Sequence, residues 1–358
     1  MTKKTKKPPA SKPAFDPNKA ATYDGLFGLP YREDESKVVL IGAPWNATTS
    51  YGGATDKGPK AIYDASMQVD LYDPVMGNPH EAGIYLVPPP RTLVELNRIA
   101  RANALPILKR GGDIGDSKPL KRALKRVNAA GETLNRLTYR RTQQLLKEGR
   151  LVGVVGGDHS VPFGAIRAYA ERYPGMGILH LDAHADLREA FEGFTWSHAS
   201  IMHNVVKRLP GVTSIVPVGV RDFCEQEAEM IRKSGGRIVD AFLQHKIVRA
   251  RAEGRSWVSL CTDIAHALPP EVYLSFDIDG LNPAECPHTG TPVPGGPSLE
   301  DITTLLQVVA QKHTIIGFDL CEVAPGPDGD EWDGNVGARL LYKMIGYALL
   351  SQRNRTAR

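Results

Sequence analysis

Three short apolar runs of this 358-residue chain lead directly into acidic or histidine side chains, and this feature limits the folds that the chain can adopt. The runs cover residues 151–155, 177–181 and 272–276. Buried strands that alternate with helical segments form a parallel sheet, and the carboxyl ends of its strands share one edge, where ligands bind. We therefore expect the polar residues that follow the three runs to meet at one site.

The middle run continues into LHLDAHAD, residues 179–186, where polar side chains recur at every second position. Successive side chains of a strand point to opposite faces, so Asp182, His184 and Asp186 share a face if the chain stays extended. Burying such groups beside a strand costs free energy unless they have a partner, and a divalent metal ion is the simplest partner. Taken alone, the stretch is equally compatible with a strand end whose polar residues are solvated.

The other two runs add side chains of the same kind. The first is followed by two glycines, Asp158 and His159, and the third by Asp277 and Asp279. Two histidines and four carboxylates suit a pair of hard-to-borderline divalent ions, whose charges would neutralise the carboxylates. The candidate metal ligands are His159, Asp182, His184, Asp186, Asp277 and Asp279.

The motifs GGDHS, DAHAD and SFDIDGLNP occur in this order and resemble those of the ureohydrolase family, which comprises arginases, agmatinases and other hydrolases of guanidino compounds. The similarity extends over residues 38–350. It implies two divalent ions bridged by Asp182 and Asp277. It also implies that His159 and Asp186 complete the coordination of one ion, and His184 and Asp279 that of the other. This ligand set suits Mn²⁺, and its two imidazoles also suit Ni²⁺.

The resemblance implies a mechanism as well. A guanidinium carbon is a poor electrophile because its charge is delocalised, and two metal ions supply a strong nucleophile by lowering the pKa of a shared water. Asp186 matches the residue that passes a proton to the leaving nitrogen. His198 matches the histidine that relays protons near the pocket mouth, although Ala199 follows it where many relatives have glycine.

Two further residues are expected to bind the substrate. Glu322, in DLCEVAP, matches the carboxylate that pairs with the guanidinium; an exposed acid after a strand is the alternative interpretation. Thr291, in HTGTP, matches a position close to the substrate in relatives. His288, in the same motif, is bulkier than the small residue often found there, and it either narrows the pocket or lies outside it.

Strand-like and helical segments alternate along the chain, which predicts an α/β fold with a parallel sheet between helices. The resemblance sharpens this to a three-layer α/β/α sandwich with a mostly parallel, eight-stranded sheet; a (β/α)₈ barrel is the alternative that the pattern alone allows. No element is assigned to residues 78–118, which are rich in Gly, Pro and Asp. The further expected strands are residues 37–42, 214–219 and 314–320, and the expected helices include residues 120–148, 199–209 and 335–350.

The N-terminal residues 1–21 are rich in Lys and Pro and are expected to form a disordered tail before a single domain at 22–358. The first 15 residues hold five lysines and no acid, so without them the net charge of +4 becomes −1. A nearly neutral body argues against nucleic acid as a partner. The four cysteines form no CxxC pair, and no apolar stretch resembles a signal peptide or a membrane span. We expect a cytoplasmic protein without a membrane partner.

Together these features predict a binuclear-metal hydrolase that cleaves a C–N bond of a guanidino compound and releases urea with ammonia or an amine. The segments SHASIM, HTGTPVPGG and DEWDGNVGARLLYK resemble a branch of longer ureohydrolases that includes guanidine hydrolases and enzymes acting on N-alkylguanidines such as metformin. Guanidine or a small N-alkylguanidine is therefore the expected substrate. Arginase, agmatinase or guanidinobutyrase activity is the alternative within the family.

A non-catalytic subunit that supports an active partner is the alternative of another class. Degenerate subunits typically lose metal ligands, whereas this chain keeps all six, so an active enzyme is favoured. The resemblance further implies a homo-oligomer, either a trimer or a hexamer. A hetero-oligomer with a related subunit is left open.

Overall fold

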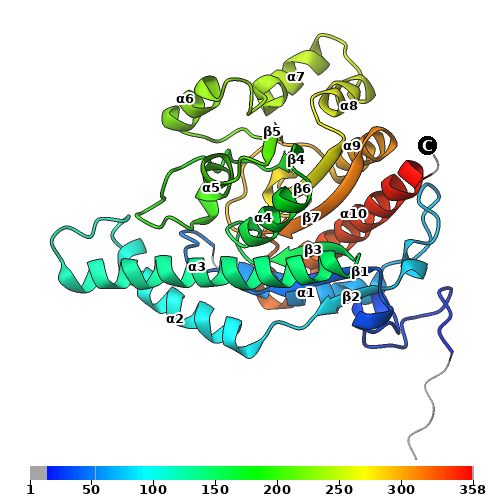
Figure 1. Cartoon of the computed structure of the whole chain (residues 1–358), viewed down its shortest axis with the longest axis horizontal. Coiled ribbons are helices and arrows are strands. Elements are labelled where there is room, and N and C mark those ends of the chain that lie inside the picture. The colour runs from blue at the N-terminus through cyan, green and yellow to red at the C-terminus, as the bar shows by residue number, and fades with distance from the viewer. Residues whose placement is uncertain (1–13, 53, 357–358) are drawn as a thin grey trace, which may run out of the picture.

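The computed structural model describes residues 14–52 and 54–356, and their strands form one parallel sheet (Figure 1). The strand order is β2-β1-β3-β7-β6-β4-β5, and every neighbouring pair is parallel. The strands are β1 Val38–Ala43, β2 Ile84–Val87, β3 Leu151–Gly156, β4 Met176–Leu181, β5 Val212–Val218, β6 Glu271–Asp277 and β7 Thr314–Cys321. The sheet is open, with β2 and β5 at its edges, so it is not a (β/α)₈ barrel.

Helices cover both faces of the sheet, as the three-layer prediction requires (Figure 1). They are α1 Gly58–Ala65, α2 Arg91–Leu108, α3 Lys118–Lys147, α4 Phe163–Arg172, α5 Ile201–Arg208, α6 Glu225–Lys233, α7 Gln244–Ala252, α8 Trp257–His266, α9 Leu299–Lys312 and α10 Trp332–Thr356. Adjacent residues of a strand enter different core clusters: Leu40 packs on the side of α8, α9 and α10, and Val39 on the side of α4 and α5. None of the described helices is both long and apolar enough to cross a membrane.

The described sheet has seven strands, one fewer than the eight that the resemblance implied. A segment beside β5 makes only a single parallel bridge, between Ile215 and Ile238. Two hydrogen bonds of 2.8 and 2.9 Å link Ile215 to Arg237 and Val239, and the chain then turns into a 3₁₀ helix at Asp240–Phe242. The pairing stops after one residue, so this segment does not form an eighth strand.

The middle of the sheet explains how the site is assembled. The three apolar runs of the sequence are β3, β4 and β6, and they occupy the middle of the sheet together with β7. All four strands run in the same direction, so their carboxyl ends lie at one edge. The expectation that residues after the three runs meet is therefore confirmed, and β7 brings Glu322 to the same edge.

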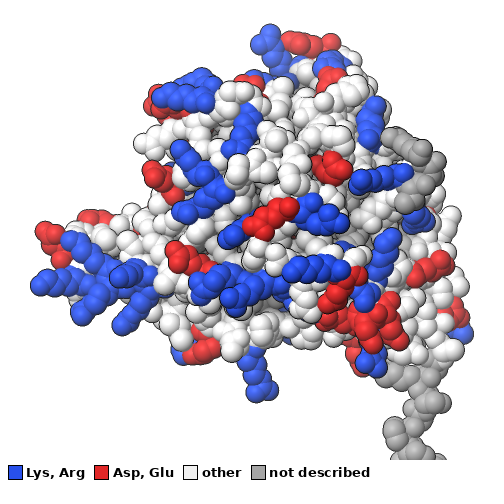
Figure 2. Space-filling view, viewed as in Figure 1, with Lys and Arg blue, Asp and Glu red and all other residues white. Residues whose placement is uncertain are grey.

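Basic side chains gather along α3 on the face shown in Figure 2. The opposite side of this helix packs inward through Val127, Leu134 and Leu145. The exposed basic residues are Lys118, Lys121, Arg122, Lys125, Arg126, Arg136, Arg140 and Lys147. The helix is therefore amphipathic, and its basic side lies outside the cavity described below.

The predicted tail falls partly outside the described residues, which begin at residue 14. Within the part that is described, the ring of Phe15 lies 6.4 Å from that of Tyr23 and 6.0 Å from that of His80, both in edge-on geometry. Phe15 also packs against the main core cluster. The chain is thus attached to the body from Phe15 onwards.

Deleting residues 1–13 should leave the fold and the metal content unchanged, because the described anchor begins at Phe15 and the deleted segment is rich in Lys and Pro. Thermal unfolding and elemental analysis of the truncated protein measure this. A Phe15→Ala variant is the comparison that removes the anchor itself. Lost assembly or lost metal in the truncated protein would show that the segment contributes to the structure.

Candidate metal centre and active-site cavity

The chain turns in the same way at the carboxyl ends of β3, β4 and β6. In each, an Asp accepts a hydrogen bond from the backbone N–H two residues further on, which is the geometry of an Asx turn. The donor–acceptor distances are 3.1 Å for Asp158 and Ser160, 2.6 Å for Asp182 and His184, and 2.9 Å for Asp277 and Asp279. These aspartates therefore end the strands and also bring the candidate ligands to one place.

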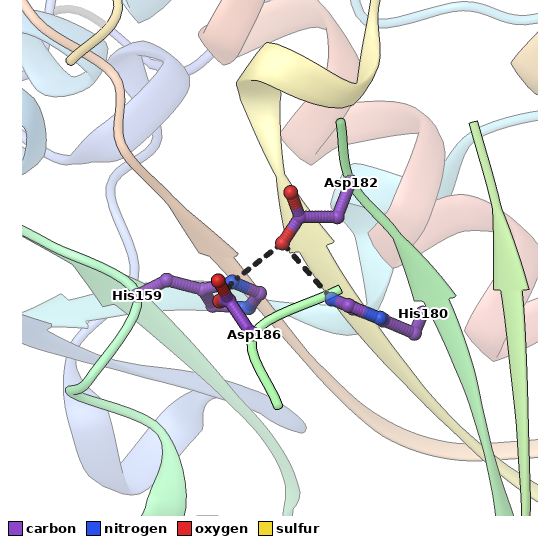
Figure 3. A group of neighbouring side chains, drawn as sticks. All are labelled: His159, His180, Asp182 and Asp186. Atoms are coloured by element: carbon purple, nitrogen blue, oxygen red, sulfur yellow. Dashed lines mark hydrogen bonds and ion pairs between the residues drawn. The ribbon is translucent and has the colours of Figure 1, made fainter. Parts of the chain in front are cut away.

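The first group of candidate ligands surrounds His159 (Figure 3). The Nδ1 atom of His159 lies 3.1 Å from Oδ2 of Asp182 and 3.1 Å from Oδ2 of Asp186. Oδ2 of Asp277 lies 3.5 Å from the same nitrogen. The four side chains are buried and come from three strand ends, and the three carboxylates lie within 3.5 Å of the same nitrogen.

The second group surrounds His184 and shares Asp182 with the first. The Nδ1 atom of His184 lies 3.1 Å from Oδ2 of Asp279 and 3.5 Å from Oδ1 of Asp182. Asp279 also accepts a hydrogen bond of 3.0 Å from the backbone of Ala183, which ties the β6 loop to the β4 loop. Five of the six predicted ligands thus fall into two groups that share Asp182, and the sixth, Asp277, contacts the first group through His159.

The electrostatics of the cluster fit two divalent ions. Burial lowers the pKa of His184, but the carboxylates of Asp182 and Asp279 outweigh burial and raise it to about 12. Burial and the charge of Asp182 raise the pKa of Asp186 to about 6, and burial with the charge of Asp279 raises that of Asp277 well above its usual range. The buried carboxylates therefore favour positive charge at this place. Divalent ions can supply that charge and satisfy the same carboxylates.

His180 was not predicted from the sequence, yet it lies beside the first group (Figure 3). Its Nε2 atom lies 2.9 Å from Oδ2 of Asp182, and the residue is 1% exposed. The signal was present, because alternation along a strand puts His180 on the same face as Asp182, two residues later. His180 contacts the shared carboxylate and so holds it in position.

A second contact orients His159 from the side away from the cluster. Its Nε2 atom lies 3.0 Å from the hydroxyl of Ser275 and 3.6 Å from Oδ1 of Asp319, and Ser275 donates a hydrogen bond of 3.2 Å to the same carboxylate oxygen. Ser275, Asp319 and His159 are all fully buried. A proton on Nε2 can be donated to this pair, which leaves Nδ1 free to bind a metal ion.

Replacing Asp319 with Asn should weaken metal binding by about 10–100-fold, because the imidazole loses the charged partner that fixes its tautomer. Chelator competition measures the affinity without reference to activity. Asp116→Asn is the matched control, since Asp116 is exposed and pairs with the exposed Lys121. Equal metal affinities of the Asp319→Asn variant and the control would show that the contact has no orienting role.

A cavity of about 180 Å³ opens above the cluster. Asp186, Asp277 and His184 line it together with the predicted substrate-binding residues His198, Thr291 and Glu322. The remaining lining residues are Ser50, Arg188, Phe191, Ala199, Asp222 and Glu227. The cavity therefore joins the metal-binding groups to the residues expected to contact a substrate.

Glu322 follows β7 and lines this cavity, and one of its carboxylate oxygens has no hydrogen-bond partner among the described residues. Its backbone is left-handed, with φ of 63°, and Oε1 accepts a hydrogen bond of 2.9 Å from the backbone N–H of His159. Oε2 is buried and has no hydrogen-bond partner in the described structure. A side chain at Gly290 would place its Cβ 2.9 Å from that oxygen, so glycine leaves the room above it. Burial, followed by the charge of Asp158, raises the pKa of Glu322 well above its usual range. A bound cation would favour its ionised form.

Trp196 and His288, two bulky residues close in sequence to His198 and Thr291, do not line the cavity. Trp196 lines a separate groove of about 620 Å³ beside α3 and α4, where its ring lies 4.9 Å from that of Phe163. His288 does not line the cavity; its backbone N–H and its Nδ1 atom lie 2.9 and 3.0 Å from the carboxylate oxygens of Asp333 at the start of α10. His288 therefore anchors the loop that carries Thr291. Thr291 itself donates a hydrogen bond of 3.1 Å to Asp279.

Arg221 contacts the loop that carries Thr291 as well. Its guanidinium donates hydrogen bonds of 2.9 to 3.3 Å to backbone carbonyls of several segments. The acceptors are the carbonyl oxygens of Gly219, Asp279, Gly280, Leu281 and Val293. A single planar group thus joins the end of β5 to the chain before and after Thr291.

Replacing Arg221 with Lys should lower the unfolding free energy by at least about 1.5–3 kcal/mol, because one ammonium cannot reach all of these carbonyls and some are left unpaired. Thermal and urea unfolding measure the loss. Arg122→Lys, on the exposed side of α3, is the matched control. If Arg221→Lys unfolds like the control, the carbonyl contacts add nothing to stability.

Comparison with known proteins identifies the family of the chain. The sequence model of the Arginase family matches residues 36–346. The chain is 29% identical to the N(1)-aminopropylagmatine ureohydrolase of Synechocystis sp., over 90% of this chain and 92% of that protein. It is also 29% identical to the proclavaminate amidinohydrolase of Streptomyces clavuligerus, over 86% and 87% of the two chains. The agmatine ureohydrolase structure of Thermoplasma volcanium has the same fold, with a TM-score of 0.69, 20% identity, and coverage of 92% of this chain and 96% of that one.

Proposed function

The chain belongs to the Arginase family of metal-dependent ureohydrolases, and from this premise we propose that it hydrolyses a small guanidine to urea and ammonia or an amine. The observation that carries the proposal is the free, buried Oε2 of Glu322 in the cavity above the two ligand groups. A carboxylate in this position suits a guanidinium through charge-assisted hydrogen bonds. The proposal assigns the metal-binding role to His159, Asp182, His184, Asp186, Asp277 and Asp279.

Bound divalent ions would supply a shared water of lowered pKa as the nucleophile. Glu322 would hold the guanidinium with its carbon facing the cluster, and Thr291 would keep Asp279 oriented through its hydrogen bond. Addition of water to that carbon forms a C–O bond, and the adduct then breaks a C–N bond. The leaving nitrogen gains a proton that the attacking water gives up. Asp186 lines the cavity beside His198, so we assign the delivery of that proton to these two residues.

The size of the cavity supports a small substrate. Sites for drug-sized ligands typically enclose about 300–1,000 Å³, and the cavity here encloses about 180 Å³. Trp196 and His288 do not limit it, so the preference rests on the cavity itself and on the resemblance to hydrolases of guanidine and N-alkylguanidines. We propose guanidine or a small N-alkylguanidine as the substrate, in preference to arginine and agmatine.

A non-catalytic subunit is the second candidate, and the completeness of the site weighs against it. Five of the six ligands fall into two groups that share Asp182, Asp277 contacts His159, and Glu322, His198 and Thr291 line the adjoining cavity. The proposal includes Mn²⁺ or Ni²⁺ as the ion and a homotrimer or homohexamer as the assembly. It places the enzyme in the cytoplasm, which the four free cysteines support.

Urea release by the purified chain tests the proposal. The protein is loaded with Mn²⁺ or Ni²⁺ and assayed with guanidine, dimethylguanidines, agmatine, 4-guanidinobutyrate and arginine. We expect the highest kcat/KM for guanidine or a dimethylguanidine. A preference for arginine or agmatine would reject the proposed substrate and leave the reaction in place. No urea from any of the five compounds with either metal would reject the catalytic role of the isolated chain.

A further inference from the structure

One cation lies in the wall of the cavity, and no step of the proposed reaction uses it. Arg188 is the only Lys or Arg among the described residues that line the cavity. Its guanidinium carbon lies 5.0 Å from the ring centre of Phe191, and that ring packs edge-on against His198 at 5.8 Å. Arg188, Phe191 and His198, in contact in this order, therefore form one side of the cavity.

The donors of Arg188 are free to contact a ligand. Within the described part of the chain its guanidinium makes no hydrogen bond, and its ion pair with Glu227 is a loose one, with 3.7 Å between Nε and Oε2. Glu227 is engaged elsewhere: it accepts hydrogen bonds of 3.0 and 2.9 Å from the backbone of Leu187 and Cys224. The side chain of Arg188 is 40% exposed and that of Glu227 only 4%, so the cation is the member of the pair that faces a ligand.

The position of Arg188 is fixed at its backbone. Its N–H donates a hydrogen bond of 3.1 Å to the carbonyl of Ala199, next to His198. Glu322 and Arg188 line the same cavity, so a substrate whose guanidinium pairs with Glu322 shares that cavity with Arg188. Apart from Glu227, Glu322 and the candidate metal ligands, the described acid that lines the cavity is Asp222, which is exposed. Arg188 is the described cation that a substrate's tail can contact in this cavity.

We propose, on the basis of the function proposed above, that Arg188 selects substrates by the charge of the tail. A carboxylate can accept two parallel hydrogen bonds from the guanidinium fork, whereas an ammonium is repelled by it. Short ω-guanidino carboxylates are then substrates alongside guanidine and N-alkylguanidines. Agmatine, whose tail ends in an ammonium, is disfavoured.

Two substrates of similar length but opposite tail charge test this inference, namely 4-guanidinobutyrate and agmatine. The readout is the ratio of their kcat/KM values within one preparation, so partly inactive protein cancels. The wild type should prefer 4-guanidinobutyrate, Arg188→Gln should lower the ratio by about 10–100-fold, and Arg188→Glu should reverse the preference. The change should be mainly in KM, because the tail contact is made in the ground state as well as in the transition state.

Arg136→Gln is the matched control, because it removes one positive charge from the exposed side of α3 outside the cavity. Its ratio should equal that of the wild type. An unchanged ratio in both Arg188 variants, or a wild-type preference for agmatine, would overturn the inference even though urea is released. Absence of urea from every substrate would instead reject the function on which the inference rests.

Discussion

Replacing Asp182 with Asn should cost the protein both of its metal ions and its activity. Asp182 is the one residue shared by the two ligand groups. Its Oδ2 atom lies 3.1 Å from Nδ1 of His159, and Oδ1 lies 3.5 Å from Nδ1 of His184. An amide puts an NH₂ group in place of one of these oxygens and removes the charge. Removal of a residue that only orients a metal ligand typically lowers metal affinity by about 10–100-fold, and the loss in Asp182→Asn should be larger.

Elemental analysis after gel filtration, together with urea release, measures both effects. Metal-free wild-type protein is the reference for folding, because it separates lost metal from lost structure. Asp319→Asn should give an intermediate loss and Asp116→Asn none, so the three variants form a graded series. Full metal content and normal turnover in Asp182→Asn would contradict the assignment of a binuclear centre.

The convergence of the site could be predicted from the sequence because it depends on local rules. Parallel strands end at one edge, and three runs that end in Asp or His must then bring those residues together. The same rule applies to Glu322, which follows β7. His180 could have been found as well, since it obeys the same alternation as Asp182.

Other features depend on tertiary order that no local pattern specifies. The placement of β7 between β3 and β6 is set by the packing of whole layers. No element is predicted in residues 78–118, which are rich in Gly, Pro and Asp, and this is wrong for two segments, because β2 and α2 lie there. The buried positions of α2 recur at helical spacing, at Leu93, Asn97, Ala100, Ala104 and Ile107, and this periodicity indicates a helix.

The cavity wall was the least predictable part of the site. Trp196 is close to His198 in the sequence, but its ring faces the groove beside α3. Arg188 lies two residues beyond Asp186 and carried no motif, yet it enters the cavity because the chain between Asp186 and His198 turns back on itself. The left-handed backbone of Asp186, with φ of 53°, begins that turn. Positions of this kind often store strain at functional sites. The strand-like alternation ends at Asp186, so it cannot predict the path of the residues beyond it.

Replacing His198 with Ala should leave the metal content intact and lower turnover by about 10²–10⁴-fold, the range typical for loss of a proton-transfer group. His198 lines the cavity but belongs to neither ligand group. Burial, followed by the positive charges of His184 and His159, lowers the pKa of His198 to about 4. The imidazole is therefore neutral at neutral pH and can accept a proton before passing it on. The loss should extend across the neutral range instead of being confined to one side of it.

Added imidazole distinguishes proton transfer from a structural role, because a diffusible base can restore the former alone. We expect partial recovery of urea release by the His198→Ala variant as imidazole is raised. His245→Ala, on the exposed side of α7, is the matched control. This variant should release urea at the wild-type rate, with or without imidazole. The His198→Ala substitution also removes the edge-on partner of Phe191, whose ring contacts Arg188. The ratio of kcat/KM for 4-guanidinobutyrate to kcat/KM for agmatine therefore shows whether Arg188 has moved. An unaltered rate in His198→Ala at every pH would assign this histidine to the cavity wall alone.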